Sequence, residues 1–154
     1  MTAARVLDLA RAKGWRIATA ESCTGGMVSA ALTAIPGSSD VFDRGFVTYS
    51  NAAKQAMLGV RADTLAAFGA VSEEVAAEMV QGALAHSDAQ LAVAVTGIAG
   101  PGGSEFKPEG RVCFAVVSPN GVLTETVEFG AKGRQAVRVA ACDHALALLL
   151  RGLA

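Results

Sequence analysis

Aromatic and charged residues are scarce in this sequence of 154 residues, at 5% and 18%, whereas hydrophobic residues make up 52%. So much apolar content with so little charge excludes a disordered chain. The length suits one domain with a core of its own, so we expect a single domain over residues 1–154. Ala and Val supply much of the apolar content, which favours close packing of helices and strands through small side chains.

The sequence also lacks a block of basic residues and a long apolar run. The net charge of −1 argues against nucleic-acid binding by bulk electrostatics. No apolar stretch approaches the roughly 20 residues of a membrane-spanning helix. Residues 1–13 lack the apolar core and the cleavage pattern of a signal peptide. We therefore expect a cytoplasmic protein that binds neither nucleic acid nor membrane.

Cysteine and histidine are rare, with three and two residues. The cysteines, Cys23, Cys113 and Cys142, are odd in number and widely spaced, which argues against a disulfide framework. No Cys-x-x-Cys pair occurs, and no group of His, Cys, Asp and Glu has the spacing of metal ligands. We predict a site without metal or cofactor.

Periodicity, caps and chain breakers predict helices and strands that alternate along the chain. Helices are expected at residues 1–13, 24–35, 51–59, 63–68, 72–84 and 131–153, and strands at 15–20, 45–49, 91–95, 110–117 and 122–129. The last two strands are joined by the turn Pro119-Asn120-Gly121, which is typical of a hairpin. This order predicts an α/β layered domain around a mixed sheet with an antiparallel edge.

One polar turn, Thr-Ala-Glu-Ser-Cys-Thr-Gly-Gly at 19–26, joins the first predicted strand to a predicted helix. Such strand-to-helix turns carry ligands in α/β proteins. The amino terminus of the helix suits an anion or a developing oxyanion, and glycines let the backbone approach a ligand closely. The residues of this turn that we expect to bind substrate are Glu21, Cys23, Thr24, Gly25 and Gly26.

Ser22 in the same turn is the leading candidate for a nucleophile, and a serine needs a base to attack. Both histidines, His86 and His144, fall within or just after predicted helices and away from strand ends, so a Ser-His-Asp triad is weakly supported. Lys54 follows the second strand and can act as the base if burial lowers its pKa. Tyr49, the only tyrosine, ends that strand, where it can relay a proton or polarise a carbonyl.

Simpler interpretations stay open for each of these residues. Ser22 and Thr24 cap helices in many proteins without further function, and a lone lysine such as Lys54 is usually solvated. Cys23 is a rival nucleophile, because a thiol near a helix amino terminus can have a lowered pKa, or it is a small buried residue. Glu21 can orient Lys54, bind a ribose hydroxyl, or be a solvated turn residue.

A second loop, residues 97–103, has four glycines and one proline in seven residues and follows a buried strand. It matches neither a Walker loop nor a dinucleotide-binding fingerprint. We expect Thr96, Gly97 and Gly100 to help bind an amide, a hydroxyl or a phosphate. The polar stretch 104–108 is either a lid or a linker.

Two arginines of the last helix, Arg134 and Arg138, lie one helical turn apart. Arginine side chains with this spacing can bind a phosphate together, and they can equally form a solvated helix face. We expect them to bind substrate.

Several ordered motifs of this chain resemble the CinA C-terminal domain family. The motifs are Thr19–Gly26, Pro36–Ser39, Gly45–Asn51, Lys54, Gly69–Ser72 and Thr96–Gly103. The resemblance spans nearly the whole chain, with no departure at the main motifs. It implies a three-layer α/β/α sandwich around a mixed, mainly parallel sheet, a homo-oligomer (a dimer or larger) and no metal.

The resemblance also implies the activity of the stand-alone nicotinamide mononucleotide (NMN) deamidases. These enzymes hydrolyse the amide of NMN to nicotinic acid mononucleotide and ammonia, which recycles pyridine nucleotides. The family's catalytic serine, lysine and tyrosine fall on Ser22, Lys54 and Tyr49. We expect the pyrophosphatase-like domain of full-length CinA proteins, and its activity, to be absent. The alternative is a non-catalytic module that binds a nucleotide or a partner in competence or DNA damage. Such a module would not need Ser22, Lys54 and Tyr49 together.

Overall fold

The computed structural model describes residues 2–104 and 106–154. Its helices are α1 (Thr2–Lys13), α2 (Met27–Thr33), α3 (Asn51–Leu58), α4 (Ala62–Phe68), α5 (Glu73–Ala85) and α6 (Arg134–Leu153), with a 3₁₀ turn at Ser38–Asp40. Its strands are β1 (Ile17–Glu21), β2 (Phe42–Val47), β3 (Leu91–Gly97), β4 (Arg111–Ser118) and β5 (Gly121–Glu128). Every predicted helix and strand is confirmed within a few residues at its ends, except that Met1 lies outside the described residues.

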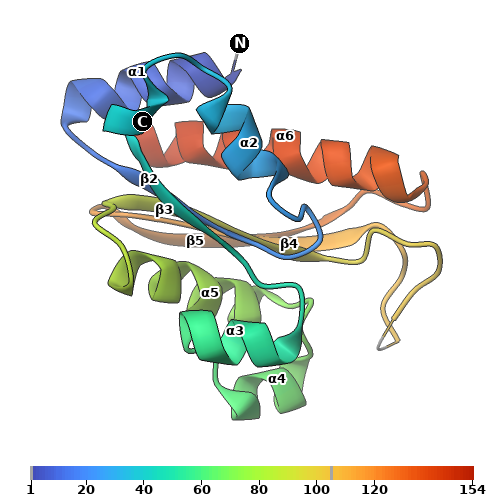
Figure 1. Ribbon diagram of the computed structural model, residues 1–154. Helices are drawn as coiled ribbons and strands as arrows, with labels where there is room; N and C mark the ends of the chain where they lie inside the picture. Colours follow the sequence, from blue (N-terminus) through green and yellow to red (C-terminus); the bar gives the residue numbers. More distant parts are fainter. Residues whose placement is uncertain (1, 105) are drawn as a thin grey trace.

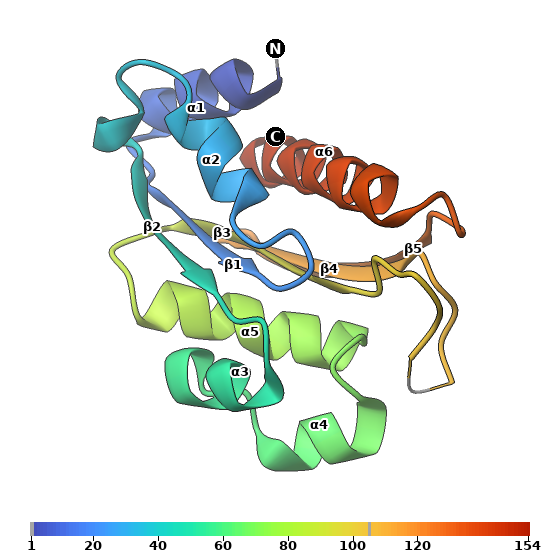
Figure 2. The same cartoon turned by 45° about the vertical axis from the view of Figure 1, so that its right-hand side comes forward.

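The five strands form one sheet in the order β2-β1-β3-β4-β5. β1 is parallel to both β2 and β3, whereas β4 is antiparallel to β3 and to β5. Helices α1, α2 and α6 cover one face, and α3, α4 and α5 cover the other (Figures 1 and 2). The predicted α/β/α sandwich around a mixed sheet with an antiparallel edge is therefore confirmed. In the part of the chain that the structure describes, no helix is long and apolar enough to cross a membrane.

The sheet has a separate apolar core on each face, because successive side chains of a strand point to opposite faces. On β3, Leu91, Val93 and Val95 pack with residues of α1, α2 and α6. Ala92 and Ala94 pack with residues of α5. Small side chains on this second face let α5 lie close to the sheet, as the abundance of alanine predicts.

Two helices begin about three residues later than the sequence pattern predicts. The helix expected from residue 24 begins at Met27, because Gly25 and Gly26 have φ of 57° and 108°. Residues in this left-handed region cannot continue a right-handed helix. The last helix, expected from residue 131, begins at Arg134 after Gly133, whose φ is 98°. The turn after β1 is therefore irregular backbone up to residue 26.

Replacing Gly82 of α5 with Ala is expected to lower the free energy of unfolding by about 2–3 kcal/mol. A Cβ atom at this position would lie 2.0 Å from the carbonyl oxygen of Leu58, where α3 ends against α5. Thermal unfolding should show a melting temperature roughly 5–10 °C below the original. Gly152→Ala is the matched control, because its Cβ would meet the end of the Leu91 side chain, which can move. An unchanged melting temperature for Gly82→Ala would contradict the close crossing of α3 and α5.

Candidate active site

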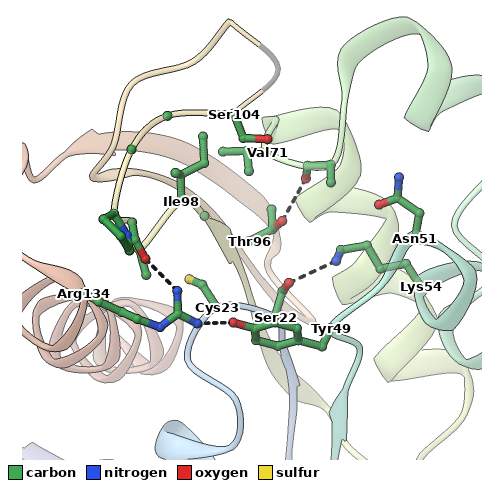
Figure 3. Close-up of a pocket in the computed structure, with 17 residues that line it drawn as sticks. Ser22, Cys23, Tyr49, Asn51, Lys54, Val71, Thr96, Ile98, Ser104 and Arg134 are labelled. Carbon is green, nitrogen blue, oxygen red and sulfur yellow. Dashed lines mark hydrogen bonds between the residues drawn. The ribbon is translucent and has the colours of Figure 1, made fainter.

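The carboxyl ends of the three parallel strands meet at one edge of the sheet and surround a cavity of about 330 Å³. The turn after β1 contributes Ser22 and Cys23, and the segment after β2 contributes Tyr49, Asn51 and Lys54. Ala70 and Val71, which follow α4, the loop after β3 and Arg134 of α6 complete the lining (Figure 3). Ligands of α/β proteins bind at the carboxyl ends of the strands, at the point where the strand order reverses.

Ser22 and Lys54 are joined by a hydrogen bond of 3.0 Å between Nζ of the lysine and Oγ of the serine. Nζ also donates to the main-chain oxygen of Thr48 over 2.9 Å. Lys54 is 2% exposed, so the expectation of a solvated helix residue is wrong for it. Its helix begins after Ser50, whose side chain accepts from the N–H of Ala53, and Lys54 lies on the buried side of that helix. The pair has the contact that a serine nucleophile and its base require.

Both histidines lie away from this pair. His86 contacts the carbonyl of Gly82 through Nδ1, and His144 pairs with Glu125 through Nε2. Neither residue lines the cavity. A histidine base for Ser22 is therefore excluded by position.

Arg134 joins the segment after β2 to the loop after β3. Its guanidinium donates to the hydroxyl of Tyr49 and, over 2.7 Å, to the carbonyl of Gly100 (Figure 3). The tyrosine side chain is otherwise open to solvent, with 58% of the residue exposed. Arg134 thus fixes the phenol at the mouth of the cavity and presents positive charge there.

Glu21 lies on the opposite side of the turn from the cavity, and its carboxylate is completely buried. It accepts hydrogen bonds from Thr24, Gly26, Val28 and Ser29. The expectation of a solvated turn residue is therefore wrong, and the carboxylate contacts neither Lys54 nor the cavity lining. The N–H groups at the start of α2, expected to bind an anion, already have this carboxylate as their partner.

Arg138 also holds the turn after β1, through main-chain carbonyls. Its Nε donates to the carbonyl of Cys23 over 3.1 Å, and one terminal nitrogen donates to the carbonyl of Thr24 over 3.4 Å. The N–H of Gly25 donates to the carbonyl of Ser22. Five of the residues expected to contact substrate lie outside the cavity lining: Glu21, Thr24, Gly25, Gly26 and Arg138.

Two glycines of the loop after β3, Gly97 and Gly100, pack closely against other parts of the protein. A Cβ on Gly97 would lie 2.6 Å from the Val112 side chain, and one on Gly100 would lie 2.5 Å from the carboxyl carbon of Glu109. The hydroxyl of Thr96 donates to the carbonyl of Ala70 over 2.8 Å. This hydroxyl therefore anchors the neighbouring loop, although Thr96, Gly97 and Gly100 all border the cavity.

The described residues after this loop, where the sequence suggests a lid or a linker, contact one another and the segment after α4. Ser104 and Lys107 pair through their main chains, and Nζ of Lys107 donates to the carbonyls of Phe68 and Val71 over 2.6 and 2.5 Å. Residue 105 of this stretch lies outside the described residues. The lid stays a prediction.

The CinA C-terminal domain family model matches residues 1–153. The chain belongs to this family. Nicotinamide-nucleotide amidohydrolase PncC of Enterobacter agglomerans is 52% identical over 143 residues, which cover 92% of this chain and 87% of that protein. PncC of Escherichia coli K12 is 52% identical over 140 residues, covering 90% and 85%.

Other relatives of this CinA C-terminal domain are longer. The CinA-like protein of Syntrophobacter fumaroxidans is 51% identical over 93% of this chain, but the match covers 34% of that protein, so this chain spans about a third of its length. Among solved structures, the competence/damage inducible protein CihA of Agrobacterium tumefaciens has a TM-score of 0.94 at 51% identity and covers 97% of this chain and 92% of that one. The fold is therefore that of the CinA superfamily.

The cavity of this CinA C-terminal domain also contains residues that the sequence analysis did not assign to it. Asn51 and Ser104 both border the cavity (Figure 3). Asn51 is the first residue of α3, three positions before Lys54, so both lie on one side of the helix. That spacing was the available signal, and Ser50 rather than Asn51 caps the helix. Across residues 2–104 and 106–154, no three His, Cys, Asp or Glu residues are grouped to hold a metal ion.

Cys23 in this CinA C-terminal domain is expected to be unreactive near neutral pH. It is 5% exposed, and burial raises the pKa of its thiol to about 11. Thiolate is the reactive form, so the protonated thiol at pH 7.5 should resist iodoacetamide. Cys23→Ala should change the turnover number by less than about tenfold. Fast alkylation with loss of activity would instead favour the thiol as nucleophile.

Proposed function

We propose that this chain is a nicotinamide-nucleotide amidohydrolase, which converts NMN and water to nicotinic acid mononucleotide and ammonia and so recycles pyridine nucleotides. The observation that carries the proposal is the buried Ser22–Lys54 hydrogen bond of 3.0 Å at the cavity. Support comes from the 52% identity to a protein named nicotinamide-nucleotide amidohydrolase, of which this chain covers 87%. The substrate is thus a small nucleotide.

In the proposed first half-reaction, Lys54 removes the proton of Ser22. Burial disfavours the charged form of an amine, which favours a neutral Lys54 that can accept this proton. Oγ then attacks the carboxamide carbon and forms a tetrahedral intermediate. Lys54 returns the proton to the amide nitrogen, the C–N bond breaks, and ammonia leaves an acyl-enzyme ester.

In the second half-reaction, water replaces ammonia. Lys54 takes a proton from the water, the hydroxyl attacks the ester carbon, and the proton passes to Oγ of Ser22 as the C–O bond breaks. The N–H of Cys23, the residue after the nucleophile, is our candidate to stabilise the oxyanion in both steps. One such donor contributes about 2.7–4 kcal/mol in comparable sites.

The two groups at the mouth of the cavity have proposed roles outside bond breaking. Tyr49 assists proton transfer or polarises the carboxamide oxygen, and Arg134 together with loop N–H groups binds the 5′-phosphate. A dianion needs several donors, and a guanidinium binds phosphate well. We also propose a cytoplasmic homo-oligomer, a dimer or larger, that binds no nucleic acid.

The experiment that tests this function is ammonia release from NMN by the purified protein in the presence of EDTA. We expect ammonia and nicotinic acid mononucleotide in equal amounts, the second measured by ion-exchange chromatography. Calorimetry on the same preparation measures NMN binding. Binding without ammonia release would contradict the proposal and favour the non-catalytic binding module.

A further inference from the structure

Glu21 is a fully buried carboxylate directly before the proposed nucleophile, and it does not border the cavity. We infer that Glu21 is a positioning residue, which holds the turn that carries Ser22 without touching substrate. The inference deepens the proposed function and rests on it, because it takes Ser22 as the attacking group. Its support is geometric and comes from three parts of the structure.

The first part is the number of hydrogen bonds that the carboxylate accepts. Oε1 accepts from the hydroxyl of Thr24 over 2.6 Å and from the N–H groups of Gly26 and Val28 over 3.2 and 3.0 Å. Oε2 accepts from the N–H and the hydroxyl of Ser29 over 3.0 and 2.9 Å. One side chain thereby joins the turn to the first residues of α2, whose N–H groups have no partner inside the helix.

The second part is the chemistry of those contacts, in which the two carboxyl oxygens of Glu21 act as acceptors. Both of its oxygens only accept hydrogen bonds, whereas an amide would turn an N–H₂ group toward donors at one of the two positions. A buried donor that loses its acceptor costs about 1–3 kcal/mol. Aspartate has the right charge, but it is one methylene too short to reach the same donors from β1.

The third part is the connection from Glu21 to the reacting groups. Neighbouring strand residues point to opposite faces, so Glu21 points toward α2 while Ser22 points toward Lys54. The carbonyl of Glu21 accepts from the N–H of Thr48 over 2.8 Å, and the carbonyl of Thr48 accepts from Nζ of Lys54. A shift of Glu21 therefore moves Ser22, because the two residues share a peptide bond. It also moves Lys54, because Thr48 is hydrogen-bonded to both Glu21 and Lys54.

The consequence concerns rate more than affinity. A misplacement of about 1 Å in a reacting group can cost on the order of a hundredfold in rate, whereas the residues that bind the substrate stay in place. We therefore expect Glu21→Gln to lower kcat for NMN by about 30- to 100-fold and to change KM by less than about threefold. The kcat of Glu21→Asp should lie between that of Glu21→Gln and that of the original protein.

A control on the same helix separates positioning from general destabilisation. Leu32 of α2 is completely buried in the core that faces α6 and contacts neither the carboxylate nor the cavity. Leu32→Ala should lower the melting temperature at least as much as Glu21→Gln and leave kcat unchanged at a temperature where both are folded. If Glu21→Gln does not fold, Thr24→Val and Ser29→Ala each remove donors and should lower kcat by about 3- to 10-fold.

A second readout does not depend on NMN turnover. A fluorophosphonate probe phosphonylates the oxygen of a serine nucleophile and releases fluoride, and mass spectrometry measures its rate of attachment to Ser22. We expect slower labelling in Glu21→Gln than in the original protein and in Leu32→Ala. Slower labelling without any ammonia release from NMN would contradict the proposed substrate and keep the positioning role. Equal kcat or equal labelling in folded Glu21→Gln would overturn the inference.

Discussion

Ser22→Ala is expected to lower kcat for NMN by at least about a thousandfold, because nucleophile knockouts in serine hydrolases remove most of the acceleration at once. KM should stay within about threefold, since the hydroxyl of Ser22 is a small part of the cavity surface and makes no large binding contribution. Steady-state ammonia release over a range of NMN concentrations measures both constants. Circular dichroism shows whether the variant keeps its fold.

The matched control for this variant is Ser104→Ala, which removes a hydroxyl from the other side of the same cavity. It should lower kcat by less than about tenfold. Turnover near the original level in Ser22→Ala would assign the attack to another group, with water activated directly by Lys54 as the first alternative. Equal losses of kcat in Ser22→Ala and Ser104→Ala would show that the rate depends on the polarity of the cavity and not on a nucleophile at Ser22.

Lys54→Met is expected to lower kcat by a similar factor, at least about a thousandfold, because Ser22 then has no base within reach. Methionine has nearly the length of lysine and no charge, so it fills the same buried space. The melting temperature should stay near that of the original protein, because methionine replaces the buried amine side chain with an apolar one of similar volume. Lys54→Ala leaves a cavity instead and should recover part of its activity when a small primary amine is added.

The control for this pair is Lys132→Met, which removes an exposed ammonium near the amino terminus of α6. It should leave kcat and KM unchanged. Recovery of Lys54→Ala by an amine, with a rate that rises as more of the amine is deprotonated, would identify the neutral amine as the base. Near-normal kcat in Lys54→Met would exclude Lys54 as the base and leave a bound water in that role.

The sequence alone predicts that Ser22, Tyr49 and Lys54 lie close together. Each follows a strand that was recognisable from its apolar run, and the carboxyl ends of parallel strands meet at one edge. The hydrogen bond between Ser22 and Lys54 depends on the direction in which α3 leaves β2, which no local pattern specifies. The same holds for Arg134, whose contact with Tyr49 joins elements that are far apart in the chain.

Glu21 shows a different limit of sequence reasoning. Its place in a polar turn suggested a solvated or ligand-binding carboxylate, because carboxylates are seldom fully buried. Strand parity was the missing signal: Glu21 shares its face with Ile17 and Thr19, which point toward α2. The glycines at 97 and 100 gave the correct signal of close approach, but the sequence could not say that the partners are Val112 and Glu109.

The position of α6 late in the chain has a consequence for synthesis on the ribosome. Ser22 and Lys54 are translated early, yet the turn and the tyrosine are held by Arg134 and Arg138 of this helix. A nascent chain that has not yet reached residue 138 contains the nucleophile and its base but not the two guanidinium groups that hold their surroundings. The site is therefore completed only when α6 has left the exit tunnel and docked on the sheet, so catalytic competence arises late in vectorial folding.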